Sequence, residues 1–178
     1  MPVQCHRMKR PLAASRGFTL LELVVVVAVI AILSMMMIPS YRDRIVRKQV
    51  AEALDGLAFA RGAIATRYAA TKTFPADNDE AGLPPPDKIV STQLSSVTVA
   101  DGALVLVFGN AADAGLKGRR LSLRPAFVEG YPQVPLVWLC AAAPVPGNMT
   151  VQGDDVTDVP ARYLPLRCQN TAPKPKAG

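Results

Sequence analysis

The sequence predicts an α+β protein with a long N-terminal helix, membrane-embedded over its first half, packed against a small antiparallel β-sheet with a C-terminal disulfide loop. Three observations predict it. Residues 18–38 form a run of 21 residues that is polar only at Thr19, Glu22 and Ser34. Apolar residues then recur every three or four positions to about Ala70, which is helical periodicity. Short alternating stretches follow, and alternation is typical of half-buried strands.

The apolar run is long enough to cross a bilayer, which takes about 20 residues. Two simpler interpretations compete. A secretory signal peptide has a shorter apolar core and a small-residue cleavage site after it, and no such site follows Ile38 cleanly. A plain membrane anchor fits the length but leaves Glu22 unexplained, because a carboxylate in hydrocarbon is costly and marks a functional site by default.

A cut between Gly17 and Phe18 would give Glu22 a partner. The new α-amino group at Phe18 would lie one helical turn from the carboxylate. Four of the 20 basic residues and none of the 14 acidic ones precede this cut, so the sequence pI of about 9.5 belongs partly to the leader and does not indicate nucleic-acid binding. The start could also be Met8, and with either start Cys5 lies in the leader.

The helix is predicted from Phe18 to about Ala70, with a kink at Pro39 because proline cannot donate to the carbonyl of Met35. Residues 40–70 form its amphipathic half. Residues 71–87 are rich in Asn, Asp, Gly and Pro and are predicted to form a long loop. Strands are expected around Val97 and Val99, over 103–108, around Leu121 and Leu123, and over 135–140, with Asp101-Gly102 as a hairpin turn.

Cys140 and Cys168 are separated by 27 residues that include four prolines and two glycines. A bridge between them would close an irregular loop, and the alternative is two independent thiols. A distal cysteine pair favours an oxidising compartment, which places the N-terminus in the cytoplasm and the domain outside it. No metal-ligand cluster, phosphate-binding loop or nucleophile motif occurs, so no cofactor, metal site or catalytic residue is predicted.

The residues of both ends resemble the type IVa pilin family. At the N-terminus the resemblance covers Gly17 to Glu52. At the other end it covers Trp138 to Cys140 and then Val159 to Cys168. The matching N-terminal residues are Phe18, Glu22, Pro39, Tyr41, Arg47, Gln49, Val50 and Glu52. The family usually has glycine where this chain has Ala31, and alanine favours a retained helix there.

The resemblance implies a leader over residues 1–17, cleavage by prepilin peptidase at Gly17/Phe18, and N-methylation of Phe18. It implies a fibre-core half helix over 18–39, a globular domain over 71–168 with a disulfide between Cys140 and Cys168, and a flexible tail over 169–178. Glu22 is expected to pair with the Phe18 amine of a neighbouring subunit during assembly. The alternative is neutralisation by its own amine.

The function implied is that of a structural pilus subunit, and not of an enzyme. The expected partners are further copies of the chain, prepilin peptidase, inner-membrane assembly machinery, minor pilins, and the membrane before assembly. The fibre would then be extracellular and serve adhesion, twitching motility or DNA uptake. A type II secretion pseudopilin and a membrane-tethered binding module are the alternatives.

Other polar clusters have simpler interpretations. Arg119 and Arg120 are expected to form a solvated turn and not a nucleic-acid contact, since this basic patch contains no aromatic residue on which a base could stack. Asp154, Asp155 and Asp158 could suggest calcium but are expected to be solvated. Tyr131 and Trp138 are expected to pack in the core or against a loop.

Overall fold

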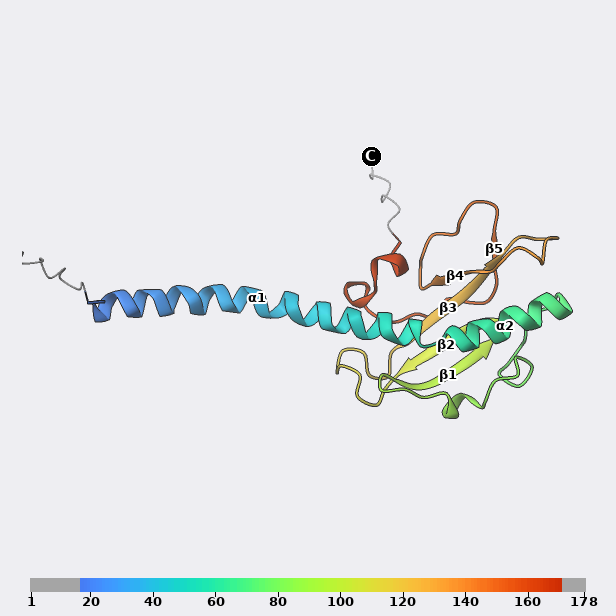
Figure 1. Cartoon of the computed structure of the whole chain (residues 1–178), viewed down its shortest axis with the longest axis horizontal. Helices are drawn as coiled ribbons and strands as arrows, with labels where there is room; N and C mark the ends of the chain where they lie inside the picture. The colour runs from blue at the N-terminus through green and yellow to red at the C-terminus, as the bar shows by residue number, and fades with distance from the viewer. Residues whose placement is uncertain (1–16, 171–178) are drawn as a thin grey trace, which may run out of the picture. The chain divides into compact units, whose positions relative to one another are not determined.

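The computed structural model describes residues 17–170, with the side chains of residues 36–40 excepted. Residues 1–16 of the predicted leader and residues 171–178 of the predicted tail therefore lie outside the described residues. The chain divides into two units at Pro39, residues 1–39 and 40–178. Helix α1 (Leu20–Asp55) runs through both units, and the remaining elements belong to the second (Figure 1).

The prediction of a single helix to about Ala70 is wrong in one respect, because the segment forms two helices. α1 ends at Asp55, and α2 (Ala58–Thr71) begins after a tight turn at Gly56 and Leu57. Leu57 has backbone angles outside the helical region, and its amide donates to the Leu54 carbonyl at 3.3 Å. Glycine is among the weakest helix formers, so Gly56 favours the break. The helix continues through Ala31 and Pro39.

No helix within the described residues is long and apolar enough to cross a membrane. The span over residues 18–39 and the kink at Pro39 stay predictions.

The apolar stripe predicted for the helix is confirmed from Val46 onward. Its residues are buried, and they pack against one face of the sheet to form the main core. Burying a valine, leucine or isoleucine side chain stabilises a fold by about 1.5–3 kcal/mol, so this stripe holds both helices on the sheet. Its members are Val46, Val50, Ala53, Leu54, Leu57, Ala60, Ile64 and Tyr68.

The sheet is antiparallel and consists of β1 (Leu94–Ala100), β2 (Ala103–Phe108), β3 (Arg120–Phe127), β4 (Val137–Cys140) and β5 (Thr150–Val151). Its order is β1-β2-β3-β4, with β5 also paired to β3. The four predicted strands are confirmed, and β5 was not predicted. Pro125 lies where the partner of β3 changes, since β2 pairs up to Leu123 and β5 pairs from Ala126. A missing N–H is tolerated at such a position.

The predicted hairpin turn at Asp101-Gly102 is confirmed. Both residues have positive φ, at 48° and 82°, as the favoured two-residue hairpin turn requires. Gly102 is also packed closely against Phe74, since a Cβ at this position would lie 2.7 Å from the Phe74 ring. Phe74 in turn stacks on Tyr68 at 4.2 Å between ring centroids. The turn therefore packs directly against the end of α2.

The loop after β4 covers the opposite face of the sheet. Ala126, Leu139 and Ala143 form a second small core there, packed by Met149 and Val151. Among the described residues, Ser122 and Asn78 are the buried polar ones. The Ser122 hydroxyl accepts from the Val156 amide at 2.9 Å, and the Ser122 amide donates to the Thr157 hydroxyl at 3.0 Å. These bonds hold the loop on β3.

We expect Gly102→Ala to destabilise the domain more than Gly118→Ala. Both glycines have positive φ, but a Cβ at Gly118 meets nothing within 4 Å. The change at Gly118 should therefore cost only the backbone penalty of about 1–2 kcal/mol, while the change at Gly102 should add about 1–3 kcal/mol of overpacking against Phe74. Thermal or denaturant unfolding of the two variants measures the difference. Equal losses would show that the Phe74 contact yields without cost.

Candidate functional site: the start of the helix and its attachment to the domain

The segment that begins α1 presents the residues predicted for processing and assembly. Gly17, Phe18 and Thr19 precede the helix, and all three are exposed. The Glu22 amide donates to the Thr19 hydroxyl at 3.2 Å. Thr19 is thus an N-cap, and Glu22 occupies the third helical position, as in a capping box. Glu22 therefore lies in the first turn, where the helix dipole favours a negative charge.

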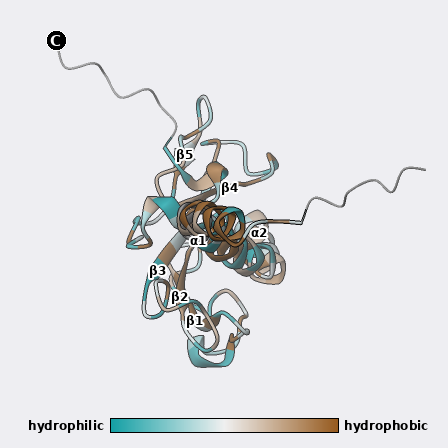
Figure 2. Cartoon of the chain, turned by 90° about the vertical axis from the view of Figure 1, so that its left-hand side faces the viewer, coloured by the Kyte–Doolittle hydropathy of each residue, from teal (hydrophilic) through white to brown (hydrophobic). Residues whose placement is uncertain are grey.

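The first half of α1 exposes an almost wholly apolar surface. From Leu20 to Met35 every side chain is exposed, and the large hydrophobic ones are at least 45% exposed. Ser34 donates its hydroxyl proton to the Ile30 carbonyl at 2.7 Å, so this polar group is satisfied within the helix. In Figure 2 the near end of α1 is coloured as hydrophobic all round. A helix that is apolar on every side has the composition of a helix that is normally surrounded by protein or lipid.

The second half of α1 is fixed to the domain by polar contacts as well as by its apolar stripe. The Arg42 guanidinium lies 3.3 Å from both carboxylate oxygens of Asp113, in the turn after β2. The Gln49 side-chain oxygen accepts from the Asp113 amide at 3.0 Å. Further along, Arg47 donates to the Arg162 carbonyl at 2.8 Å. Three side chains of the helix thus hold two different loops.

Asp113 is the best-connected carboxylate in this set. Its Oδ1 accepts from the Gly115 amide at 2.8 Å in addition to Arg42. The Gly115 hydrogen bond, with Arg42 in support and partial burial acting against them, lowers the pKa of Asp113. In the same pair, the hydrogen bond to Asp113 raises the pKa of Arg42.

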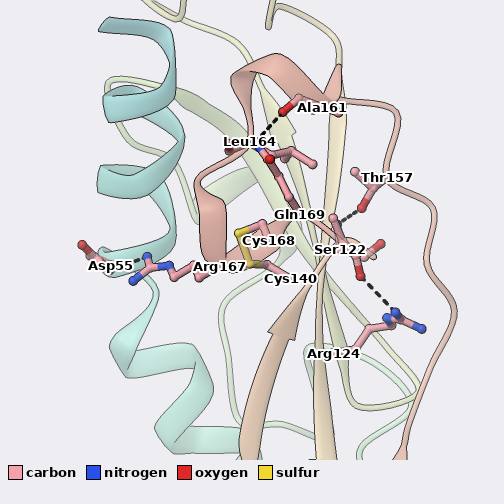
Figure 3. Close-up of a disulfide and its surroundings, with 11 residues drawn as sticks. Asp55, Ser122, Arg124, Cys140, Thr157, Ala161, Leu164, Arg167, Cys168 and Gln169 are labelled. Carbon is pink, nitrogen blue, oxygen red and sulfur yellow. Dashed lines mark hydrogen bonds and ion pairs between the residues drawn. A yellow bond between two sulfur atoms is a disulfide. The ribbon is translucent and has the colours of Figure 1, made fainter. Parts of the chain in front are cut away.

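The predicted disulfide between Cys140 and Cys168 is present, and both cysteines are buried (Figure 3). It joins the end of β4 to the 3₁₀ turn Leu166–Cys168. Next to it, Arg167 donates to Asp55 at the end of α1 at 3.0 Å. Gln169 also donates to the Ala161 and Leu164 carbonyls, so the flexible tail predicted from residue 169 is wrong for that residue. By the chain-entropy model such a bridge stabilises the fold by about 3–4 kcal/mol.

The charged clusters noted in the sequence hold the loop of residues 155–158 against β3. Arg120 pairs with Asp158 and Arg124 with Asp155, and Arg119 donates to the Asp158 carbonyl. No group of three or more possible metal ligands occurs in the part of the chain that the structure describes. Trp138 packs against the main core as predicted, whereas Tyr131 is 58% exposed and does not belong to the core.

Sequence reasoning missed two elements of the site. The Thr19 cap could have been predicted, because the sequence has the pattern Thr-x-x-Glu before an apolar run. The contact of Arg42 with Asp113 carried no local signal, because the two residues lie 71 positions apart.

Comparison with known proteins gives two family matches. Residues 46–169 match the pilin family of bacterial filament proteins, and residues 12–38 match the prokaryotic N-terminal methylation motif. The first match covers the domain and the second covers the segment around Gly17, Phe18 and Glu22.

Individual relatives agree with these matches. The chain is 29% identical to the fimbrial protein EcpC of Eikenella corrodens, over 88% of this chain and 92% of that one. It is 28% identical to the type IV major pilin protein PilE1 of Neisseria gonorrhoeae, over 88% of both chains. A fimbrial protein of Moraxella nonliquefaciens is 51% identical over 47 residues, which is 25% of this chain and 30% of that one.

We expect Asp113→Asn to remove part of the pH dependence of stability. Because the folded-state pKa of Asp113 is lowered, its contribution is present above its unfolded pKa of about 3.9 and is lost as the pH falls through the lower folded value. The stability gap between wild type and variant should therefore be largest above about pH 5 and close toward about pH 3. Unfolding midpoints across that range measure it. Asp154→Asn, at an exposed carboxylate, is the control, and an equal change in both variants would contradict the role of Asp113.

Proposed function

This chain belongs to the bacterial pilin family, and we propose that it is a structural subunit of a type IV pilus, made as a precursor and polymerised from the inner membrane. The observation that carries this proposal is the union, in one chain, of the N-terminal methylation motif with the pilin domain. The apolar surface of α1 supports it, since a helix exposed in this way needs either lipid or other apolar helices around it.

Processing is proposed at the junction of Gly17 and Phe18, by prepilin peptidase, with methylation of the new Phe18 amine. The match to the methylation motif supports this position. The local structure is also suitable, because both residues are exposed and precede the first helical turn. A peptidase therefore does not have to unwind α1 to reach the bond.

Before assembly, residues 18–39 are proposed to lie in the inner membrane, with the N-terminus in the cytoplasm. The disulfide supports this orientation, because stable disulfides form in oxidising compartments such as the periplasm. Assembly machinery and minor pilins of the inner membrane are the proposed partners. Once extruded, the same apolar surface lies against copies of itself in the fibre core, and the globular domain forms the outer surface.

Glu22 is proposed to pair with the Phe18 amine of a neighbouring subunit and so to set the stagger of each incoming copy. A pair of opposite charges in an apolar surrounding is attracted several-fold more strongly than in water. Pairing with its own amine remains the alternative. The Thr19 cap holds the backbone amide of Glu22 and so keeps Glu22 in the first turn whether or not a partner is present.

The fibre is proposed to serve adhesion, twitching motility or DNA uptake. Direct nucleic-acid contact through Arg119 and Arg120 is the weaker possibility, because both arginines are engaged by Asp158. A type II secretion pseudopilin and a membrane-tethered binding module are less well supported, since the relatives are named as pilins and fimbrial proteins.

We expect Glu22→Ala to reduce sheared fibre yield by about tenfold or more, because the assembling subunit loses an ion pair in an apolar surrounding. The precursor should still be cleaved. Thr19→Ala is the matched control, since it removes the N-cap bond and leaves the carboxylate. Immunoblots of the sheared and membrane fractions measure both. Wild-type yield from Glu22→Ala would contradict the pairing, and equal losses in both variants would show that the order of the first helical turn, and not an ion pair, limits assembly.

The intact mass of the protein in sheared fibres should equal that of residues 18–178 plus one methyl group and less two hydrogens. This single value tests cleavage, methylation and the disulfide together. A protein found only in membranes, with a mass that retains the leader, would instead support the tethered module.

A further inference from the structure

Two surfaces of the domain carry charges of opposite sign. The first is an open groove of about 490 Å³ beside α1, lined by Arg44, Arg47, Lys48, Ala51, Pro165, Leu166 and Arg167. Its lining holds four cations and no carboxylate. We call it the basic groove. Leu166 stands at its edge with 70% of its surface exposed, although both neighbouring turns are fixed by the disulfide and by Gln169.

The cations of the basic groove differ in whether they have a partner within the molecule. Lys48 pairs with Glu52, Arg167 with Asp55, and Arg47 donates to a carbonyl. Arg44 is exposed, and within the described residues it makes no hydrogen bond or ion pair. The groove thus offers an unpaired cation next to an exposed apolar side chain on a constrained turn.

The second surface is a pocket of about 320 Å³ beside the loop after α2, lined by Asp77, Asn78, Asp79, Leu83, Pro85, Pro86 and Thr98. We call it the acidic-rimmed pocket. Its walls of Leu83, Pro85 and Pro86 are apolar. The buried Asn78 fixes the loop, because its side chain accepts from the Val99 amide at 2.7 Å and donates to the Pro84 and Val97 carbonyls.

The rim of this pocket carries unpaired negative charge. Asp77 and Asp79 are exposed, and no cation lies within ion-pair distance of either in the described part of the chain. Asp77 accepts from the Glu80 amide at 2.9 Å, which orders the loop. Asp79 makes no hydrogen bond through its carboxylate among the described residues. It is the counterpart of Arg44, since each is an exposed, unpaired charge beside an apolar feature.

One molecule cannot join its own two surfaces. The basic groove flanks residues 44–51 of α1, and the acidic-rimmed pocket follows the C-terminus of α2 at Thr71. The end of α1 and the whole of α2 lie between them in the chain. In Figure 1 the red segment near residue 166 and the loop after α2 lie at opposite ends of the domain. A contact between such surfaces is head-to-tail, and a head-to-tail contact that does not close generates a filament.

We infer that, in the fibre, Leu166 of one subunit docks in the acidic-rimmed pocket of a second copy, with Arg44 of the first facing Asp79 of the second. The inference rests on the proposed function, because it names the domain surfaces through which the fibre subunits meet. Leu166 supplies the buried apolar anchor, and the opposite charges around it fix the register and exclude other arrangements.

A charge swap tests the contact in the full chain. Arg44→Glu and Asp79→Lys should each lower sheared fibre yield by about tenfold or more, since each puts like charges together at every contact. The chain carrying both changes should recover to within about threefold of wild type, since every contact then regains opposite charges. Asp154→Lys is the matched control, because Asp154 is an exposed carboxylate outside both surfaces. No rescue in the double variant would overturn the inference.

Cross-linking separates this inference from the pilus proposal. In a Cys5→Ser background, Leu166→Cys with Pro85→Cys should give covalent oligomers when sheared fibres are treated with a short bismaleimide. Leu166→Cys with Val145→Cys, at another exposed loop residue, should stay monomeric. Fibres without cross-linked oligomers would overturn the docking contact and leave the pilus subunit intact. Oligomers from a chain that never forms fibres would retain the contact and refute the pilus.

Discussion

The packing of the helical stripe from Val46 to Tyr68 on the sheet is the interaction on which the rest of the structure depends. Six of its eight side chains are at most 3% exposed, and they meet the buried faces of β1, β2 and β3. Without this contact α1 would have no partner along its second half, and the sheet would expose an apolar face. Because the stripe begins only at Val46, the preceding part of α1 keeps its apolar surface uncovered. The anchoring of one half thus leaves the other half available for assembly.

The domain side of the structure is organised around β3. This strand pairs with β2, β4 and β5 and also binds residues 156–158 of the disulfide loop. The buried hydroxyl of Ser122 is satisfied by that loop, which avoids the cost of an unpaired polar group. The loop in turn is closed by Cys140 and Cys168, so Leu166 and Arg167 are presented from a fixed turn. A covalent constraint within the main core therefore fixes the turn that presents these two side chains.

Charge divides along the domain in a way that suits a polymer. The acidic loop around Asp77 and Asp79 follows α2, whereas the cations Arg44, Lys48 and Arg167 gather around the second half of α1. Asp113 and Asp155 are paired within the domain. Lys48 and Arg167 also have partners, Glu52 and Asp55, whereas Arg44 and Asp79 make no ion pair within the described residues. Together with the apolar helix, this separation underlies the three contacts proposed above: helix with helix, amine with carboxylate, and domain with domain.

The sequence by itself determined the features that depend on local pattern. These are the apolar run with Glu22, the helical stripe, the hairpin at Asp101-Gly102 and the four main strands, since each is set by periodicity or by turn chemistry within a few residues. It did not reveal the break at Gly56, because a single glycine is tolerated in a helix unless packing turns the chain there. Nor did it reveal β5, the Arg42–Asp113 pair or the two complementary surfaces. Those join residues far apart in the chain, and only the tertiary fold brings such residues together.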